Sequence, residues 1–310
     1  MDRNSVTWTG YIPAVTTPFT RTGELDLTSF SEQMRWHTEQ RMHGVILAGT
    51  SGEWFSMSAD ERGRLFTEGG KHCSAEFVVI GACNAFTSRE AITHAKAAEH
   101  AGLDGLLLTP PPYLVPNRRE IVKFYQDVSD STELPICVYN WPRGCIVDLD
   151  TDTLLELASI DNIVAVKNST GNFSAFLEGM YALEGAVRYF GLPTTELGAD
   201  LALLGHGDGL MGSGGVLGSD HPDFWRAIAA GDRHRALELG LRDRIIMQEW
   251  FTPDYGVHFG NQQAIMKTAL RLQGVPAGYV REPLLELTPD EVAKVAATLD
   301  SLGIETKPLS

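Results

Sequence analysis

A lysine stands at the end of a run that has the composition of a buried strand. Residues 163–166 are apolar, Lys167 follows, and residues 168–172 are small or polar. Burial of the lysine stem disfavours the charged ammonium group and yields the free amine that forms a Schiff base with a carbonyl compound. A strand-end lysine can also be an ordinary one whose head reaches water. Lys167 is the first candidate for chemistry.

A tyrosine accompanies this lysine. Tyr139 ends the predicted strand that precedes the strand of Lys167, and neighbouring strands of a sheet lie about 4.8 Å apart. A phenol beside a nucleophilic amine can pass protons while a Schiff base forms and breaks. The alternative is a core tyrosine with only its hydroxyl at the mouth of the fold. As a pair, the two residues predict imine chemistry.

The segment "GTSGE", residues 49–53, follows another predicted strand. Its two glycines and the hydroxyls of Thr50 and Ser51 suit a tight turn, and successive backbone amides in such a turn can hold a carboxylate. Clusters of this composition also form ordinary loops. We expect Glu53 to have a structural, hydrogen-bonding role.

The elements that must position these residues recur along the chain. Short aliphatic runs, apolar on both faces, alternate with helix-like segments at the length of one strand-helix unit, which is typical of a parallel sheet covered by helices. Ser58 with Glu61, and Thr87 with Glu90, fit capping boxes that begin helices. Eight units predict an α/β fold of the (β/α)8 TIM-barrel class, with an open doubly wound sheet as the alternative. The runs begin at Ile12, Val45, Val78, Gly105, Ile136, Ile163, Val187 and Gly209.

The strand signals stop after about residue 220, and the remaining segments have helical spacing. Thr288 and Glu291 form another capping box in the last of them. We therefore expect a barrel over residues 1–225, and over residues 226–310 the eighth barrel helix with a C-terminal helical extension. No Ser/Gly linker separates the two, so they are expected to pack as one unit.

Charge and motif content exclude several functions. The chain has 25 Lys and Arg against 40 Asp and Glu, a formal net charge of −15, and no basic patch, so nucleic acid and anionic membranes are not expected partners. No secretory signal or membrane-spanning stretch is found, which predicts a cytoplasmic protein. The four cysteines lack CxxC spacing and the nine histidines lack HExxH, so no metal site is predicted.

The motifs "GTSGE", "YNWP" and "AVKNSTGN", in this order, resemble the dihydrodipicolinate synthase and N-acetylneuraminate lyase family of Schiff-base aldolases. The resemblance runs from "PAVTTPF" to "REPLLELTPDEVAKVAATLDSLG". It implies that Lys167 forms an imine with C2 of a 2-oxo acid, without any other cofactor. Tyr139 is then the general acid and base, Thr50 continues the proton relay, and Gly49, Ser51 and nearby amides hold the carboxylate.

The resemblance also implies an assembly. In the family, a tyrosine in the loop after the fourth strand crosses a dimer interface to complete the relay, and Tyr113 in "TPPPYLVP" stands at the matching position. A homo-oligomer, most often a tetramer built as a dimer of dimers, follows from this.

This chain departs from the family pattern at two positions that bind the second substrate in the family. The synthase branch has an arginine five residues after the tyrosine, where this chain has Gly144, so Arg143 is the candidate substitute. The lyase branch has acidic residues after the glycine that ends the seventh strand, but Leu192 and Pro193 follow Gly191 here. The glycine remains a candidate contact.

The segment "GLMGSGG", residues 209–215, resembles the lyase and keto-sugar-acid branches and makes Ser213 a candidate substrate contact. We expect a lyase that acts on pyruvate or a 2-keto(-3-deoxy) acid by aldol cleavage, condensation or dehydration, since an imine withdraws electrons from C3 in all three. The alternatives are dihydrodipicolinate synthase proper, with pyruvate and aspartate semialdehyde, and a non-catalytic barrel that binds a keto acid. A third is a phosphate-binding barrel that uses the glycine-rich "GSGGVLGSDHP".

Overall fold

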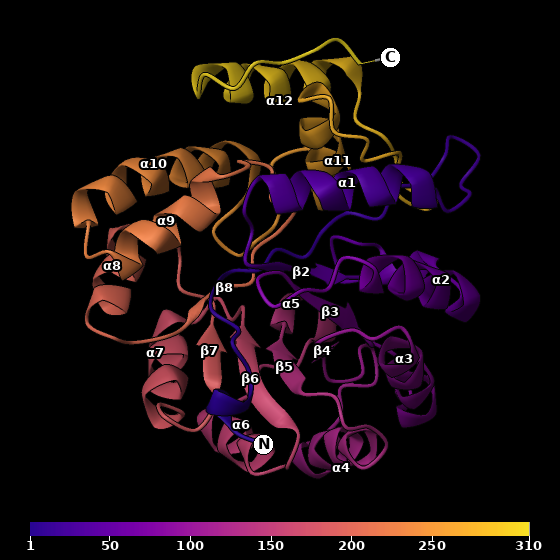
Figure 1. The fold of residues 1–310 in the computed structure, drawn as a ribbon, viewed down its shortest axis with the longest axis vertical. Helices are drawn as coiled ribbons and strands as arrows, with labels where there is room; N and C mark the ends of the chain where they lie inside the picture. The colour runs from indigo at the N-terminus through magenta and orange to yellow at the C-terminus, as the bar shows by residue number, and fades with distance from the viewer. Residues whose placement is uncertain (310) are drawn as a thin grey trace.

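A computed structural model describes residues 1–309. Eight strands form one parallel sheet in the order β1-β8-β7-β6-β5-β4-β3-β2, and helices surround it (Figure 1). The predicted (β/α)8 barrel is thereby confirmed. The strands are β1 (Gly10–Tyr11), β2 (Gly44–Leu47), β3 (Val78–Ala82), β4 (Gly105–Leu108), β5 (Ile136–Asn140), β6 (Ile163–Asn168), β7 (Arg188–Phe190) and β8 (Gly209–Leu210).

The barrel closes through the segment that follows β1. Ala14 bridges to both Ile46 and Ser213, and the Val15 amide donates to the Ile46 carbonyl at 3.0 Å. Pro13 lies between β1 and this bridge and has no backbone N–H, so the regular ladder stops before it. The first strand is therefore shorter than the predicted run, but the ring of strands is complete.

The helices follow the strands in alternation, with a short one, α5 (Pro142–Cys145), directly after β5. Full capping boxes form at Ser58 with Glu61 and at Thr288 with Glu291. At Thr87 the side chain caps the helix, but Glu90 bonds the Phe86 amide instead of the Thr87 amide. The helices around the barrel are α1 (Leu27–Glu39), α2 (Ala59–Gly70), α3 (Ser88–His100), α4 (Arg118–Ser129), α6 (Thr151–Ala158), α7 (Phe173–Ala182), α8 (Glu196–Leu203) and α9 (Asp220–Ala229).

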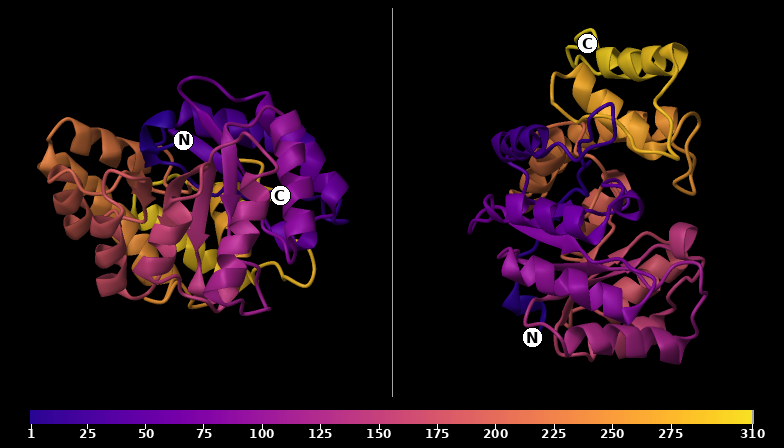
Figure 2. Two further views of the ribbon diagram at one scale, coloured as in Figure 1. Left: turned by 90° about the horizontal axis from the view of Figure 1, so that it is seen from below. Right: turned by 90° about the vertical axis from the view of Figure 1, so that its right-hand side faces the viewer.

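Three further helices form the C-terminal extension: α10 (Arg233–Trp250), α11 (Gln262–Leu272) and α12 (Pro289–Ser301). The α11–α12 end and the N-terminus lie at opposite ends of the molecule (Figure 1; Figure 2, right). These helices share an apolar cluster around Trp250, which is fully buried. No helix within residues 1–309 is long and apolar enough to cross a membrane.

The alternation of strand residues sets the direction of the two candidate side chains. On β5, Cys137 and Tyr139 belong to the cluster inside the barrel, whereas Ile136 and Val138 belong to the cluster beneath the helices. Side chains two residues apart on a strand share a face, so Lys167 on β6 faces the interior with Ala165. Both candidates thus point into the barrel at its carboxyl end, where barrel enzymes carry their active sites.

Candidate active site

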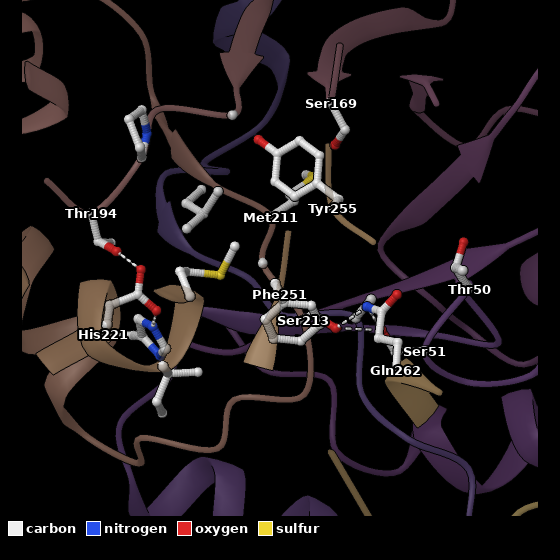
Figure 3. A pocket seen from close by; sticks show the side chains of 18 of the residues that line it. Thr50, Ser51, Ser169, Thr194, Met211, Ser213, His221, Phe251, Tyr255 and Gln262 are labelled. Atoms are coloured by element: carbon white, nitrogen blue, oxygen red, sulfur yellow. Dashed lines mark hydrogen bonds and ion pairs between the residues drawn. The ribbon is translucent and has the colours of Figure 1, made fainter. Parts of the chain in front are cut away.

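A cavity of about 590 Å³ opens at the carboxyl ends of the strands. The barrel contributes its floor, and α10, α11 and the loop between them contribute part of its wall (Figure 3). Of the predicted site residues, seven line it: Gly49, Thr50, Ser51, Tyr139, Lys167, Gly191 and Ser213. Tyr113 and Arg143 are not in the wall.

Lys167 and Tyr139 lie side by side at the floor of the cavity. They are partners in the register of β5 and β6, and the Lys167 Nζ atom lies 4.2 Å from the centre of the Tyr139 ring. Both side chains are buried, Lys167 being 6% exposed. The strand pairing therefore brings together the amine and the phenol that sequence reasoning paired.

Burial sets the protonation of the pair. It lowers the pKa of Lys167 from 10.5 to about 8, because the apolar surroundings disfavour the charged form. Burial raises the pKa of Tyr139, and hydrogen bonds with the Ser169 and Thr50 side chains only partly oppose that effect. At pH 7 about a tenth of the lysine is then free amine, far more than for an ordinary lysine, and the phenol keeps its proton and can donate it.

Polar side chains just beyond the pair fix the two strand ends. The Asn140 amide donates to Asn168 at 3.0 Å and to Asp148 at 2.7 Å, and the Asn168 amide donates to the Tyr189 hydroxyl at 2.7 Å. Asn140 and Asn168 follow Tyr139 and Lys167 directly, so their position was a usable sequence signal. Their hydrogen bonds hold the reactive side chains in register.

The "GTSGE" turn forms the second part of the site. The amides of Gly52 and Glu53 turn back onto the carbonyls of Gly49 and Thr50. Within residues 1–309, the amides of Thr50 and Ser51 have no such acceptor. Two unpaired N–H groups beside a cavity suit a carboxylate.

Helix α11 braces this turn from the C-terminal extension. The Gln263 side-chain amide donates to the Thr50 carbonyl at 3.0 Å. The Lys267 Nζ atom lies 2.5 Å from Glu53 Oε1 in a fully buried ion pair. The backbone amide of Arg281 also donates to the Glu53 carboxylate. The expected structural, hydrogen-bonding role of Glu53 is confirmed.

Gly191 lines the cavity where no other residue fits. Its φ is +132°, and a Cβ atom would lie 2.3 Å from the Asn168 carbonyl oxygen. Of the two residues that follow, Leu192 is buried and Pro193 lines the cavity. The glycine thus lets β7 approach β6 closely beside Lys167.

A polar group that sequence reasoning missed lies across the cavity. Asp243 on α10 accepts from His221 Nε2 at 2.8 Å and from the Thr194 hydroxyl (Figure 3). Tyr11 stacks on His221 at 4.2 Å between ring centres. Nothing local marks Asp243, because one more acidic residue is ordinary in a helix as rich in charged residues as α10. Asp243 lines the cavity together with its two partners, so this polar group is part of the wall.

Tyr113 lies on the surface of the single chain. It is 83% exposed and has a left-handed backbone, φ +71°, and Leu114 and Val115 beside it are exposed as well. Its role in a relay stays a prediction that needs a second copy of the chain.

Arg143 pairs outside the cavity. Its Nη1 atom lies 2.8 Å from Asp254 Oδ2 in the loop between α10 and α11. The next residue, Tyr255, contacts the ring of Trp141, which in turn stacks on Tyr139 at 5.9 Å. The geometry therefore lends no support to Arg143 as a substrate contact, and its guanidinium anchors the loop instead.

We expect Arg143→Ala to leave pyruvate binding within about twofold of the unchanged protein, since an exposed ion pair contributes about 1 kcal/mol or less. The measurement is the pyruvate concentration that gives half-maximal borohydride trapping. A loss of tenfold or more would place the guanidinium at the carboxylate.

The glycine-rich segment before α9 does not favour phosphate. Asp220 and Asp223 occupy the first turn of that helix, and negative charge there opposes an anion at the helix N-terminus. Within residues 1–309, no cluster of His, Cys, Asp and Glu suited to a metal ion occurs.

Known proteins match over almost the whole chain. The sequence model of the Dihydrodipicolinate synthetase family matches residues 7–302. The 4-hydroxy-tetrahydrodipicolinate synthase of Neisseria meningitidis serogroup B is 32% identical over 296 residues, which cover 95% of this chain and 98% of that protein. A DapA-like lyase of Rhizobium meliloti is 28% identical, with 96% and 97% covered.

A solved structure agrees. The chloride-inhibited dihydrodipicolinate synthase of Acinetobacter baumannii, complexed with pyruvate, superposes with a TM-score of 0.84 at 28% identity, over 96% of this chain and all of that one. The match spans the barrel, the lysine and tyrosine at its mouth, and the C-terminal helices. The chain belongs to the dihydrodipicolinate synthetase family and is a lyase of the Schiff-base aldolase class.

Proposed function

We propose that Lys167 forms an imine with C2 of pyruvate or of a 2-keto(-3-deoxy) acid, and that the chain then makes or breaks a bond to C3 or next to it. One observation carries the proposal: a buried amine with its pKa lowered to about 8 lies 4.2 Å from the ring of a protonated phenol, at the floor of a cavity. An exposed structural lysine has neither property.

The proposed steps use groups that the cavity brings together. The free Lys167 amine attacks C2, and the Tyr139 hydroxyl supplies the proton with which the C2 oxygen leaves as water. The resulting protonated imine withdraws electrons from C3, so a C3 carbanion becomes accessible as an enamine. Thr50, whose hydroxyl lies near that of Tyr139, passes the proton onward, and Gly49, Ser51 and Ser213 hold the carboxylate. These reaction steps require no cofactor other than the lysine itself.

We further propose a homo-oligomer, a dimer of dimers, in which Tyr113 of a second copy reaches Thr50. The exposed apolar side chains of Leu114 and Val115 beside Tyr113 support a contact surface at this loop. The proposed substrates are water-soluble acids, which fits the cytoplasmic location expected from the sequence.

For the reaction at C3 we propose one of three types: aldol cleavage, aldol condensation or dehydration. The relatives named as synthases make dihydrodipicolinate synthase proper the main alternative. Turnover of pyruvate with aspartate semialdehyde at an ordinary enzymatic rate would favour that alternative. Release of pyruvate or of a dehydrated semialdehyde from a keto-sugar acid would favour aldol cleavage or dehydration of a 2-keto-3-deoxy acid.

Borohydride reduction in the presence of pyruvate, followed by peptide mass spectrometry, tests the shared step. We expect one reduced pyruvate adduct, located on Lys167. An adduct on a different lysine, or none, contradicts the proposal. Binding of pyruvate without an adduct would instead support a non-catalytic keto-acid-binding barrel.

The pH dependence follows from the lowered pKa of Lys167. Only the deprotonated amine attacks, so the rate of imine formation at saturating pyruvate should rise about tenfold per pH unit below pH 8 and level off above it. Stopped-flow or quenched trapping measures this rate. A rate that still rises toward the ordinary lysine value of 10.5 would show that the amine is not desolvated.

A further inference from the structure

Three side chains from three distant parts of the chain form a hydrogen-bonded triangle in the cavity wall. Ser51 Oγ and Ser213 Oγ lie 2.6 Å apart, and Gln262 Nε2 lies 2.6 Å from Ser213 Oγ and 3.4 Å from Ser51 Oγ (Figure 3). Two members were candidate substrate contacts. The third, Gln262, belongs to α11 and matched no motif.

A count of hydrogens shows what the triangle offers a ligand. The Gln262 nitrogen carries two hydrogens and only donates, so it can donate to both hydroxyl oxygens. The bond between the serines uses one hydroxyl hydrogen. Neither hydroxyl has another partner among residues 1–309, so the second hydroxyl hydrogen has no acceptor in the protein, whichever serine carries it.

This free hydrogen lies where a carboxylate is expected. Ser51 also presents one of the two backbone amides without an acceptor, and Ser51, Ser213 and Gln262 all line the cavity. Two amides and one hydroxyl then converge as donors around the turn. An anion satisfies all of them at once.

The helix that carries Gln262 is held to the same turn. Its next residue, Gln263, bonds the Thr50 carbonyl, and Lys267, farther along α11, forms the buried ion pair with Glu53. These contacts restrict the position of the Gln262 amide relative to the serines.

We infer that Gln262 is a positioning residue for the carboxylate of the 2-oxo acid. By donating to both serine oxygens, it leaves one hydroxyl hydrogen free to donate to the substrate. The inference rests on the proposed function. It makes the C-terminal extension part of the substrate-binding site rather than only a support of the barrel.

The inference predicts that the donor character of residue 262 matters more than its size. In Gln262→Glu the new carboxylate accepts from the hydroxyls, uses the free hydrogen and places a negative charge next to the substrate anion. Gln262→Met removes the donor but adds no acceptor and no charge. We expect the half-saturating pyruvate concentration for trapping to rise about 30-fold or more for the first and about 3- to 10-fold for the second.

Two readouts separate positioning from loosened structure. The trapping rate at saturating pyruvate should stay within about twofold, because the amine and the phenol are untouched. Pyruvamide, which lacks the carboxylate, should lose much less affinity than pyruvate in Gln262→Glu. Gln126→Glu, the same change at a partly exposed position of α4 outside the cavity, serves as the charge control, and its pyruvate trapping should match that of the unchanged protein.

The outcomes distinguish this inference from the proposed function. Absence of a Lys167 adduct in the unchanged protein would overturn the proposed function, and the inference with it. Normal trapping in the unchanged protein, with half-saturation in Gln262→Glu within twofold of it, would overturn the inference alone. Equal losses for pyruvate and pyruvamide would also overturn it. If Gln262→Glu does not fold, as judged by its thermal transition, a half-saturation in Gln262→Met within twofold of the unchanged protein overturns it.

Discussion

Lys167→Met is expected to abolish both turnover and the reduced pyruvate adduct. Methionine has a similar length and suits the apolar surroundings of this side chain, but it has no amine to attack C2. Every later step depends on the imine, so the loss should reach the detection limit, on the order of 10⁴-fold or more. Intact mass after borohydride reduction and a pyruvate-coupled rate assay measure the two effects.

The thermal transition of Lys167→Met should stay at or above that of the unchanged protein, because an amine whose burial is unfavourable has been removed. Lys96→Met, at an exposed lysine of α3, is the matched control and should keep the adduct on Lys167. An adduct that persists in Lys167→Met would assign the nucleophile to another lysine.

Tyr139→Phe is expected to lower turnover by about 10² to 10⁴, the contribution of a well-placed acid and base. The ring and its stack on Trp141 remain, and so does the contact with the Lys167 amine. What disappears is the hydroxyl that lies near the Thr50 and Ser169 side chains. The imine should still form, slowly, and remain trappable, so steady-state turnover and the trapping time course separate the two roles.

Tyr125→Phe is the matched control for this change. The Tyr125 hydroxyl is also buried and does not line the cavity; it donates to the Leu108 carbonyl at 2.7 Å and meets only the backbone of Tyr139, not its phenol. Its loss should lower the free energy of unfolding by about 1 to 3 kcal/mol and lower turnover far less than Tyr139→Phe does, because the phenol of Tyr139 is kept. If Tyr139→Phe showed the same pattern, with stability reduced and turnover intact, Tyr139 would be a core tyrosine and the acid would lie elsewhere.

The residues that sequence reasoning could reach all lie at strand ends. When a strand ends on a polar residue, the alternation of its side chains predicts where that residue lies and which face it points to, as for Tyr139 and Lys167. The turn at Gly49 to Glu53 was equally readable, because its composition fits a turn wherever it occurs. For such residues, local pattern and barrel topology together place the side chain.

Other residues could not be placed in this way. Asp243 and Gln262 lie on helices, and helical spacing does not say which neighbouring element each face meets. Arg143 was a reasonable substrate contact from its position, yet Asp254, distant in the chain, binds its guanidinium. The contacts of Tyr113 could not be predicted either, since its proposed partner belongs to a second copy of the chain.

The sequence by itself determined the barrel, the order of its strands and the amine and phenol at its mouth, because these depend on periodicity and on residues within one strand-helix unit. Only the tertiary structure decided how α10 and α11 close the cavity, with Asp243 at one end and Gln262 at the other. The physical reason is that packing and hydrogen bonds between distant segments choose these contacts. Imine chemistry is therefore readable along the chain, whereas the cavity-lining groups on the C-terminal helices become visible only once the chain has folded.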